Sequence, residues 1–84
     1  MEKWELLKLG RSIITVFSPQ GKTTVDLKEY LRYRDARPKS MNPLVEELME
    51  AAIVPILTDG WEPFESVIDK DGLIFFYIFR RKIP

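Results

Sequence analysis

Residues 73–79 have the sequence Leu-Ile-Phe-Phe-Tyr-Ile-Phe. The length of this run and its bulky side chains predict a β-strand that is apolar on both faces. A half-buried strand of an antiparallel sheet alternates apolar and polar residues, whereas a strand covered on both sides does not. This strand therefore needs a cover on each face, and an 84-residue chain has little material to provide both.

The turn before this strand decides which of its residues share a face. Residues 69–72, Asp-Lys-Asp-Gly, have the aspartate and the glycine that are typical of a type I turn closed by a glycine bulge. The strands Trp61–Asp69 and Leu73–Arg81 are then antiparallel. One face carries Ile68 with Ile74, Ser66 with Phe76, Phe64 with Ile78 and Glu62 with Arg80. Its apolar pairs and its one ion pair predict that this face receives the helices.

The other face of this hairpin is also rich in large apolar side chains: Trp61, Pro63, Val67, Leu73, Phe75, Tyr77 and Phe79. In water they would form a patch of roughly several hundred Å², which is unusual for a monomer, and aromatic residues are enriched at interfaces. Either another chain covers this face, or the N-terminal hairpin, a short helix or the chain ends fold over it. We favour a homodimer interface made of Trp61, Val67, Phe75, Tyr77 and Phe79.

The N-terminal part of the chain predicts a second hairpin. Its strands are Trp4–Leu9 and Ser12–Phe17, joined at residues 10–11, Gly-Arg. Glycine at the first position of a two-residue connection is typical of a type II′ turn, which requires a positive φ there. This turn would place Lys8 opposite Ile13.

A short helix is predicted after this hairpin. Residues 18–21, Ser-Pro-Gln-Gly, form a turn by composition, and the chain stays extended through residues 22–25. Asp26 then caps a helix from about residue 27 to 36, with a glutamate three positions later as in a capping box. The alternative is a strand through residues 25–33.

The main helix is predicted from about Pro43 to Val54. Asn42 is its cap and Pro43 its first residue, where a missing amide costs little. Apolar residues recur at helical spacing at Leu44, Val45, Leu48, Met49 and Ala52. Pro55 should end or kink this helix. The sequence thus predicts a single α+β domain, residues 1–84, with about four antiparallel strands in two hairpins, one main helix and a short second helix.

Composition limits the chemistry of this chain. Cysteine and histidine are absent, which excludes disulfides, thiolate ligands and the commonest general base. The serines have no histidine to activate them, and the acidic residues between 59 and 71 lack the spacing of a calcium loop. Residues 21–23, Gly-Lys-Thr, lack the first glycine of a phosphate-binding loop. We expect no enzymatic activity, no metal site and no cofactor.

Nothing in the sequence predicts a membrane protein. The longest apolar run, residues 73–79, is too short to span a bilayer, and the first residues do not form a signal peptide. Thirteen basic residues balance thirteen acidic ones, which offers no net attraction to anionic lipid. We expect a cytoplasmic protein without a membrane partner.

Basic residues cluster at Arg32, Arg34, Arg37 and Lys39, close to two tyrosines. Guanidinium groups bind phosphates and aromatic rings stack on bases, so this segment predicts an anion or nucleic-acid contact. The alternative is that Arg34 and Arg37 complement the dipole at the C-terminal end of the short helix and pair with local acids. The second basic cluster, residues 80–82, has Glu2, Glu5 and Glu62 as alternative partners.

Three short motifs resemble a family of small, mostly bacterial domains, domain of unknown function 4177. They are Lys-Trp-Glu at 3–5, Asp-Gly-Trp-Glu at 59–62 and Tyr-Ile-Phe-Arg-Arg at 77–81. The likeness covers about residues 3–9 and 44–81, and residues 18–43 look like an insertion. Pro63 stands where the family usually has leucine, which predicts an edge strand or a bulge. The resemblance implies a small α+β domain without catalytic activity.

The function that these observations predict is a non-catalytic module that forms a homodimer or binds a protein partner. The alternative is a nucleic-acid-associated protein that uses the segment Arg32–Lys39.

Overall fold

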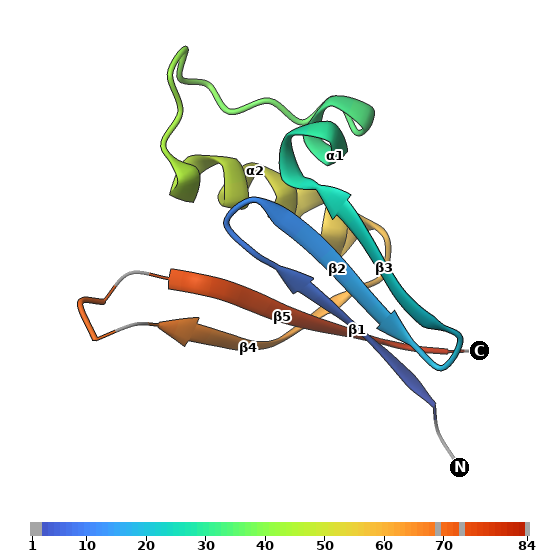
Figure 1. The fold of residues 1–84 in the computed structure, drawn as a ribbon. Coiled ribbons are helices and arrows are strands. Elements are labelled where there is room, and N and C mark those ends of the chain that lie inside the picture. The colour runs from blue at the N-terminus through green and yellow to red at the C-terminus, as the bar shows by residue number, and fades with distance from the viewer. Residues whose placement is uncertain (1–2, 69, 73, 84) are drawn as a thin grey trace.

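The computed structural model describes residues 3–68, 70–72 and 74–83. Within these residues the chain forms an antiparallel sheet of five strands and two helices (Figure 1). In chain order these are β1 (Trp4–Leu9), β2 (Ile13–Ser18), β3 (Gly21–Asp26), α1 (Leu27–Tyr33), α2 (Val45–Thr58), β4 (Glu62–Ile68) and β5 (Ile74–Lys82). The spatial order is β3-β2-β1-β5-β4. The predicted α+β class is confirmed, with β3 as a strand beyond the four expected.

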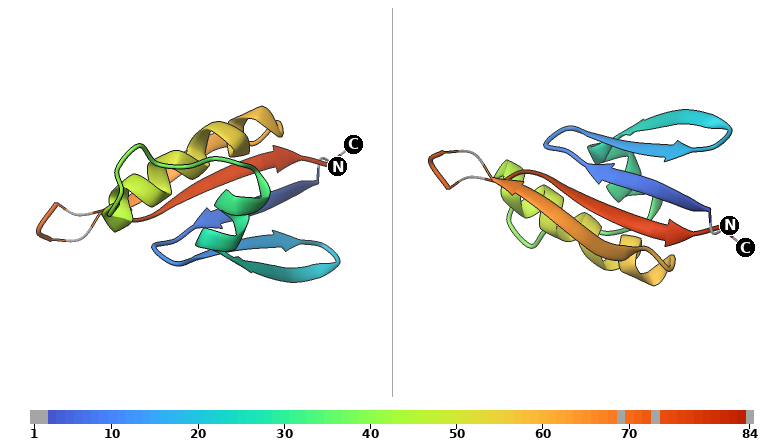
Figure 2. Two further views of the ribbon diagram at one scale, coloured as in Figure 1. Left: turned by 90° about the horizontal axis from the view of Figure 1, so that it is seen from above. Right: turned by 90° about the horizontal axis from the view of Figure 1, so that it is seen from below.

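Both helices lie on the same face of the sheet (Figure 2). The buried core fills the space between them and the strands, and it consists of Leu7, Leu9, Ile14, Leu27, Leu31, Met49, Ala52, Ile56, Trp61 and Phe79. Strand β5 is the longest, and it pairs with β1 on one side and with β4 on the other. The last strand of the chain thus holds the N-terminal and C-terminal parts of the sheet together.

The N-terminal hairpin has the predicted strands but a different connection. Leu9 pairs with Ile14, so the register differs by two residues from the predicted one. Gly10 is not in the positive-φ region and donates its N–H to the Ile13 carbonyl at 3.0 Å. A Cβ at this position would lie 3.0 Å from the same oxygen, so glycine is needed here for close approach of the backbone. Since a shift of two residues preserves side-chain alternation, the faces of both strands are as expected.

The predicted helix at residues 27–36 exists and is shorter. The Asp26 carboxylate accepts hydrogen bonds from the N–H groups of Lys28 and Glu29, as an N-cap does. Leu27 and Leu31 are buried against the sheet. The helix ends at Tyr33, close to Asp35, whose φ is 52°. The strand alternative for this segment is therefore wrong.

The main helix lies two residues later at its start and four residues later at its end than predicted. It begins at Val45, and the Glu47 side chain accepts a hydrogen bond from the N–H of Leu44. Pro55 does not end it: the helix continues to Thr58, whose hydroxyl donates to the Val54 carbonyl at 2.9 Å. The burial of Pro55 and Ile56 in the core keeps this last turn in place. Gly60, with φ 90°, follows the helix as a left-handed cap.

The hairpin of β4 and β5 agrees with prediction at its two ends and differs in the middle. Glu62 pairs with Arg80 and Ile68 with Ile74, as expected, whereas Val67 pairs with Phe76. One irregularity falls between Pro63 and Glu65 on β4, and the second falls between Val67 and Ile68. The two shifts offset one another, which is why only the central pairs move. The turn residues Asp69 and Leu73, on which the prediction rested, lie outside the described residues.

Candidate functional site

The face of the sheet opposite the helices is the candidate site, and we call it the open face. Leu7 and Leu9 are buried toward the helices, so the alternate residues of β1 point the other way, and the pairing register extends this face across the sheet. It consists of Trp4, Leu6 and Lys8 of β1; Ile13, Thr15 and Phe17 of β2; Lys22 and Thr24 of β3; Glu62, Phe64, Glu65 and Val67 of β4; and Phe76, Ile78 and Arg80 of β5.

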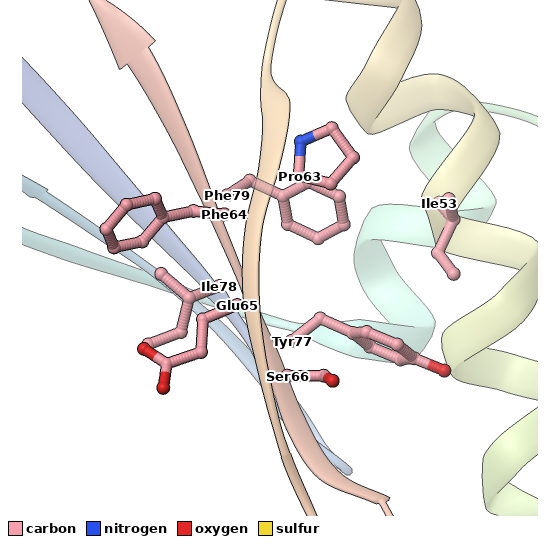
Figure 3. A pocket seen from close by; sticks show the side chains of 8 residues that line it. All are labelled: Ile53, Pro63, Phe64, Glu65, Ser66, Tyr77, Ile78 and Phe79. Atoms are coloured by element: carbon pink, nitrogen blue, oxygen red, sulfur yellow. The ribbon is translucent and has the colours of Figure 1, made fainter.

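Large apolar side chains of the open face are only partly covered. Trp4, Leu6, Ile13, Phe17 and Phe64 are between 38% and 53% exposed. No helix formed by the described residues lies over them, as the view from below the sheet in Figure 2 shows. Exposed apolar residues that are scattered singly are normal, but four of these lie on the paired strands β1 and β2, and Phe64 lies on the same face of β4, across β5 from them (Figure 3).

Cations lie against the aromatic rings of the open face. The Arg80 guanidinium is 4.6 Å from the centre of the Trp4 ring and 4.9 Å from that of Phe64. The same group donates from its Nε to the Glu62 carboxylate at 2.6 Å. The Lys8 ammonium lies 4.5 Å from the centre of the Phe76 ring. These contacts hold the aromatic side chains in place and occupy part of their ring faces.

Pro63 marks the edge of the sheet, as the sequence predicted. It lies on the edge strand β4, and the pairing becomes irregular directly after it. Figure 3 shows that Phe64 and Glu65 both point away from α2, whereas Pro63 points toward it. The bulge thus adds a phenylalanine to the open face, next to Ile78.

The predicted interface is wrong for its central members. Trp61 is 6% exposed and Phe79 is 2% exposed, because both are part of the core beneath the helices. Tyr77 packs against this core, with its ring centre 6.4 Å from that of Phe79. Phe75 is 48% exposed, and Val67 lies on the open face opposite Phe76. The structure therefore separates the five residues and reverses the face that receives the helices.

The pairing of β5 with β1 is the physical reason for this reversal. Phe79 lies opposite Leu7, and Tyr77 lies opposite Leu9. Since Leu7 and Leu9 share their face with the buried Ile14, the odd-numbered residues of β5 join the core. Apolarity alone does not distinguish the two faces of β5. The neighbouring strand does, because β1 places Lys8 on the open face.

Ion pairs at the end of β5 agree with one of the alternatives that the sequence left open. Arg81 donates to the Glu5 carboxylate at 2.7 Å and to the Asp59 carbonyl at 2.9 Å. Its guanidinium lies 4.2 Å from the centre of the Trp61 ring. Together with the pair of Arg80 and Glu62, these contacts confirm Glu5 and Glu62 as partners of the basic residues at 80–81.

The basic segment Arg32–Lys39 does not form a single patch of unpaired cations. Arg32 pairs with Glu29 at 3.1 Å, and Arg37 pairs with Asp35 at 3.8 Å. Arg34 donates to the Asp59 carboxylate, which raises the pKa of the guanidinium and joins the C-terminal ends of α1 and α2. Lys39 is exposed. The alternative of pairing with local acids is confirmed for Arg37, whereas Arg34 pairs with an acid 25 residues further along the chain.

A shallow groove of about 370 Å³ lies between α2 and the edge strand β4. Ile53, Pro63, Ser66, Tyr77 and Phe79 line its helix side (Figure 3). Burial, and to a smaller extent the Glu50 carboxylate, raises the pKa of the Tyr77 phenol above its ordinary value of 10.0. The groove thus contains a hydroxyl that stays protonated, among mostly apolar side chains.

The raised pKa of Tyr77 predicts a loss of stability at alkaline pH. Above pH 10 the unfolded chain releases the phenolic proton that the folded chain retains, so the contribution of Tyr77 is full below pH 10 and is lost as the pH rises through the folded value. In Tyr77→Phe, the difference between the free energies of unfolding at about pH 8 and about pH 11 should be smaller than in the wild type. Urea unfolding at both pH values measures it. Tyr33→Phe, at a residue 86% exposed, is the control, and an equal change in both variants would contradict the assignment.

No protein-family model, curated protein or solved structure matches this chain. The resemblance to domain of unknown function 4177 stays a prediction. Within residues 3–68, 70–72 and 74–83, no three acidic side chains come together as a metal site, and neither helix is long and apolar enough to cross a membrane. The open face is therefore the feature from which a function can be argued.

Proposed function

We propose that this protein is a non-catalytic module that forms a homodimer through the open face of its sheet. The observation that carries this proposal is the set of half-exposed aromatic and aliphatic side chains that β1, β2 and β4 present on one face of the sheet, without a helix from the described residues over it. Tryptophan, phenylalanine and arginine are the residue types enriched at protein interfaces, and Trp4, Phe17, Phe64 and Arg80 provide them here. The opposite face is already filled by α1 and α2.

The size of the open face suits a dimer. Five strands about 4.8 Å apart, with about six residues of about 3.3 Å each, cover roughly 24 by 20 Å, or roughly 480 Å² before side-chain relief is counted. A specific interface buries at least about 500 Å² on each partner. The flat area lies just below this bound and side-chain relief adds to it, so two open faces in contact would lie at the low end of specific interfaces, which predicts a weak, reversible dimer.

The face supports association better than the edge strand β4 does. Pro63 lacks the N–H that a further strand would need, and the bulge after it interrupts the row of hydrogen-bonding groups. Edge strands with such features are protected against pairing with another chain. We therefore place the contact on the side chains of the sheet.

Nucleic-acid binding is the rival function, and the geometry supports it less. Arg80 and Lys8 lie over the rings of Trp4, Phe64 and Phe76, so these rings are partly occupied where bases would stack. Glu62 and Glu65 add negative charge that repels phosphates. Arg32, Arg34 and Arg37 pair with acidic side chains. A protein surface of matching shape fits these features better than a polyanion does.

The mass of the protein in solution tests the proposal. Light scattering after size exclusion, from about 1 µM to about 100 µM, should show a rise from 9.9 kDa toward twice that mass. A mass of 9.9 kDa across this whole range would overturn the homodimer. Heparin chromatography tests the rival function: retention that falls steeply with salt, and that is lost when Arg32, Arg34 and Arg37 are replaced by alanine, would favour nucleic acid.

A further inference from the structure

One row of residues crosses the open face from edge to edge with a particular order of charges. The strand register connects Lys22 of β3 to Phe17, Phe17 to Leu6, Leu6 to Arg80, and Arg80 to Glu62 of β4. Leu6 lies on β1, the central strand of the five. The row therefore has an apolar residue at its centre, a ring and a guanidinium on either side of it, and opposite charges at its two ends.

We propose that two copies pack open face to open face around a two-fold axis that runs along β1 and passes over Leu6. This inference rests on the proposed homodimer and specifies its geometry. Such an axis places β3 of one copy over β4 of the other, so Lys22 lies over the partner's Glu62 and Phe17 lies over the partner's Arg80. Each residue of the row then meets a complementary one: ammonium and carboxylate, ring and guanidinium, leucine and leucine.

Aligned packing of two sheets is compatible with this axis. Stacked sheets lie about 10 Å apart with their mean strand directions within about 30° of each other. Lysine and glutamate side chains that extend toward each other can span that separation at the rim, where the ion pairs stay partly hydrated. The charged pairs would therefore determine which residues meet, while the apolar centre supplies most of the affinity.

The Lys8 ammonium lies to one side of the proposed axis, so its charge does not disfavour this packing. It is held over the Phe76 ring of β5, to one side of β1. In the partner, the two-fold axis places the Lys8 ammonium on the opposite side of β1. The two ammonium groups therefore lie away from each other. The cation–π contact thus keeps two like charges apart across the centre of the dimer.

A two-fold axis across the strands is less complementary. It would place each strand over the same strand of the partner. Over Leu6, such an axis would bring Glu62 against the partner's Glu62 and Lys22 against the partner's Lys22. The axis along β1 avoids both like-charge contacts.

A charge exchange between two variants tests this geometry. Lys22→Glu alone places a glutamate against the partner's Glu62 in each of the two symmetric contacts, and Glu62→Lys alone places a lysine against the partner's Lys22 in each of them. Each variant alone should dimerise about tenfold more weakly than the wild type, since two pairs change from attraction to repulsion. An equimolar mixture restores both pairs in a heterodimer, so its dissociation constant, measured by sedimentation equilibrium, should return to within about threefold of the wild-type value.

Two matched variants make the outcome specific. Glu65→Lys lies on the same strand and face but in the next row. Alone it keeps both Lys22–Glu62 pairs, so it should dimerise like the wild type, and in a heterodimer with Lys22→Glu it restores only one of the two pairs. Lys28→Glu, on α1 and away from the open face, should also dimerise like the wild type. If the wild type dimerises but the Lys22→Glu and Glu62→Lys mixture does not recover, or if Glu65→Lys alone weakens dimerisation as much as Glu62→Lys does, the proposed axis is wrong and the homodimer stands. A monomeric wild type overturns both proposals.

Discussion

Replacing Phe79 with alanine is expected to lower the free energy of unfolding by about 3–5 kcal/mol, because the ring is buried and its removal leaves a cavity. Phe79 lies opposite Leu7 on β1 and is 2% exposed. Its neighbour Tyr77 and the core residue Trp61 would lose contacts on the same side of the sheet. A loss of this size is a large part of the total stability of an 84-residue chain.

The matched control for Phe79→Ala is Phe75→Ala on the same strand. Phe75 is 48% exposed, so its truncation should cost less than about 1 kcal/mol. Urea unfolding followed by far-ultraviolet circular dichroism measures both variants, at one protein concentration because a dimer contributes to apparent stability. Equal losses in the two variants would show that Phe79 is not buried more deeply than Phe75, contrary to the described core.

Replacing Leu6 with glutamate is expected to weaken dimerisation at least about a hundredfold, because the carboxylate would be buried at the centre of the open face in both subunits. In the monomer this position is tolerant of charge: Leu6 is 39% exposed and lies opposite Arg80. The fold should therefore be retained while the mass at about 50 µM falls to that of one chain.

Leu57→Glu is the control, because Leu57 has nearly the same exposure, 43%, and lies on α2 on the other side of the molecule. This variant should keep the wild-type mass at every concentration. Circular dichroism spectra of both variants check that the fold is intact. If Leu57→Glu also dissociates the dimer, or if Leu6→Glu leaves the mass unchanged, the contact does not lie on the open face.

Local signals in the sequence predicted most of the secondary structure. Asp26 marked the start of α1 by its capping chemistry, and the turn at residues 18–21 and Pro63 at the edge of the sheet lie where composition placed them. These features depend on contacts within a few residues, so the sequence contains the necessary information. The fifth strand was within reach too, because residues 22–25 were expected to be extended.

The remaining features of the fold depend on contacts between residues far apart in the chain, so the sequence alone did not predict them. The faces of β5 depend on its pairing with β1, about seventy residues away in the chain, and no turn signal records that pairing. Pro55 was expected to end or kink α2, but the helix continues for one more turn, in which Pro55 and Ile56 are buried. The β4 bulge after Pro63 moved the central pairs of the hairpin by one residue, and a register counted outward from the turn could not include it.

The position of β5 between β1 and β4 also fixes the order of events during synthesis. Strands β1, β2 and β3 leave the ribosome first, and they can pair with one another as a meander. The edge of β1 that β2 leaves unpaired then has no neighbour until β5, the last of these five strands to be made, becomes available. The nascent chain therefore carries an unfinished sheet until β5 is made. Strand β4 is made before its partner β5, at a time when the edge of β1 is still free, and Pro63 disfavours pairing of β4 with that edge.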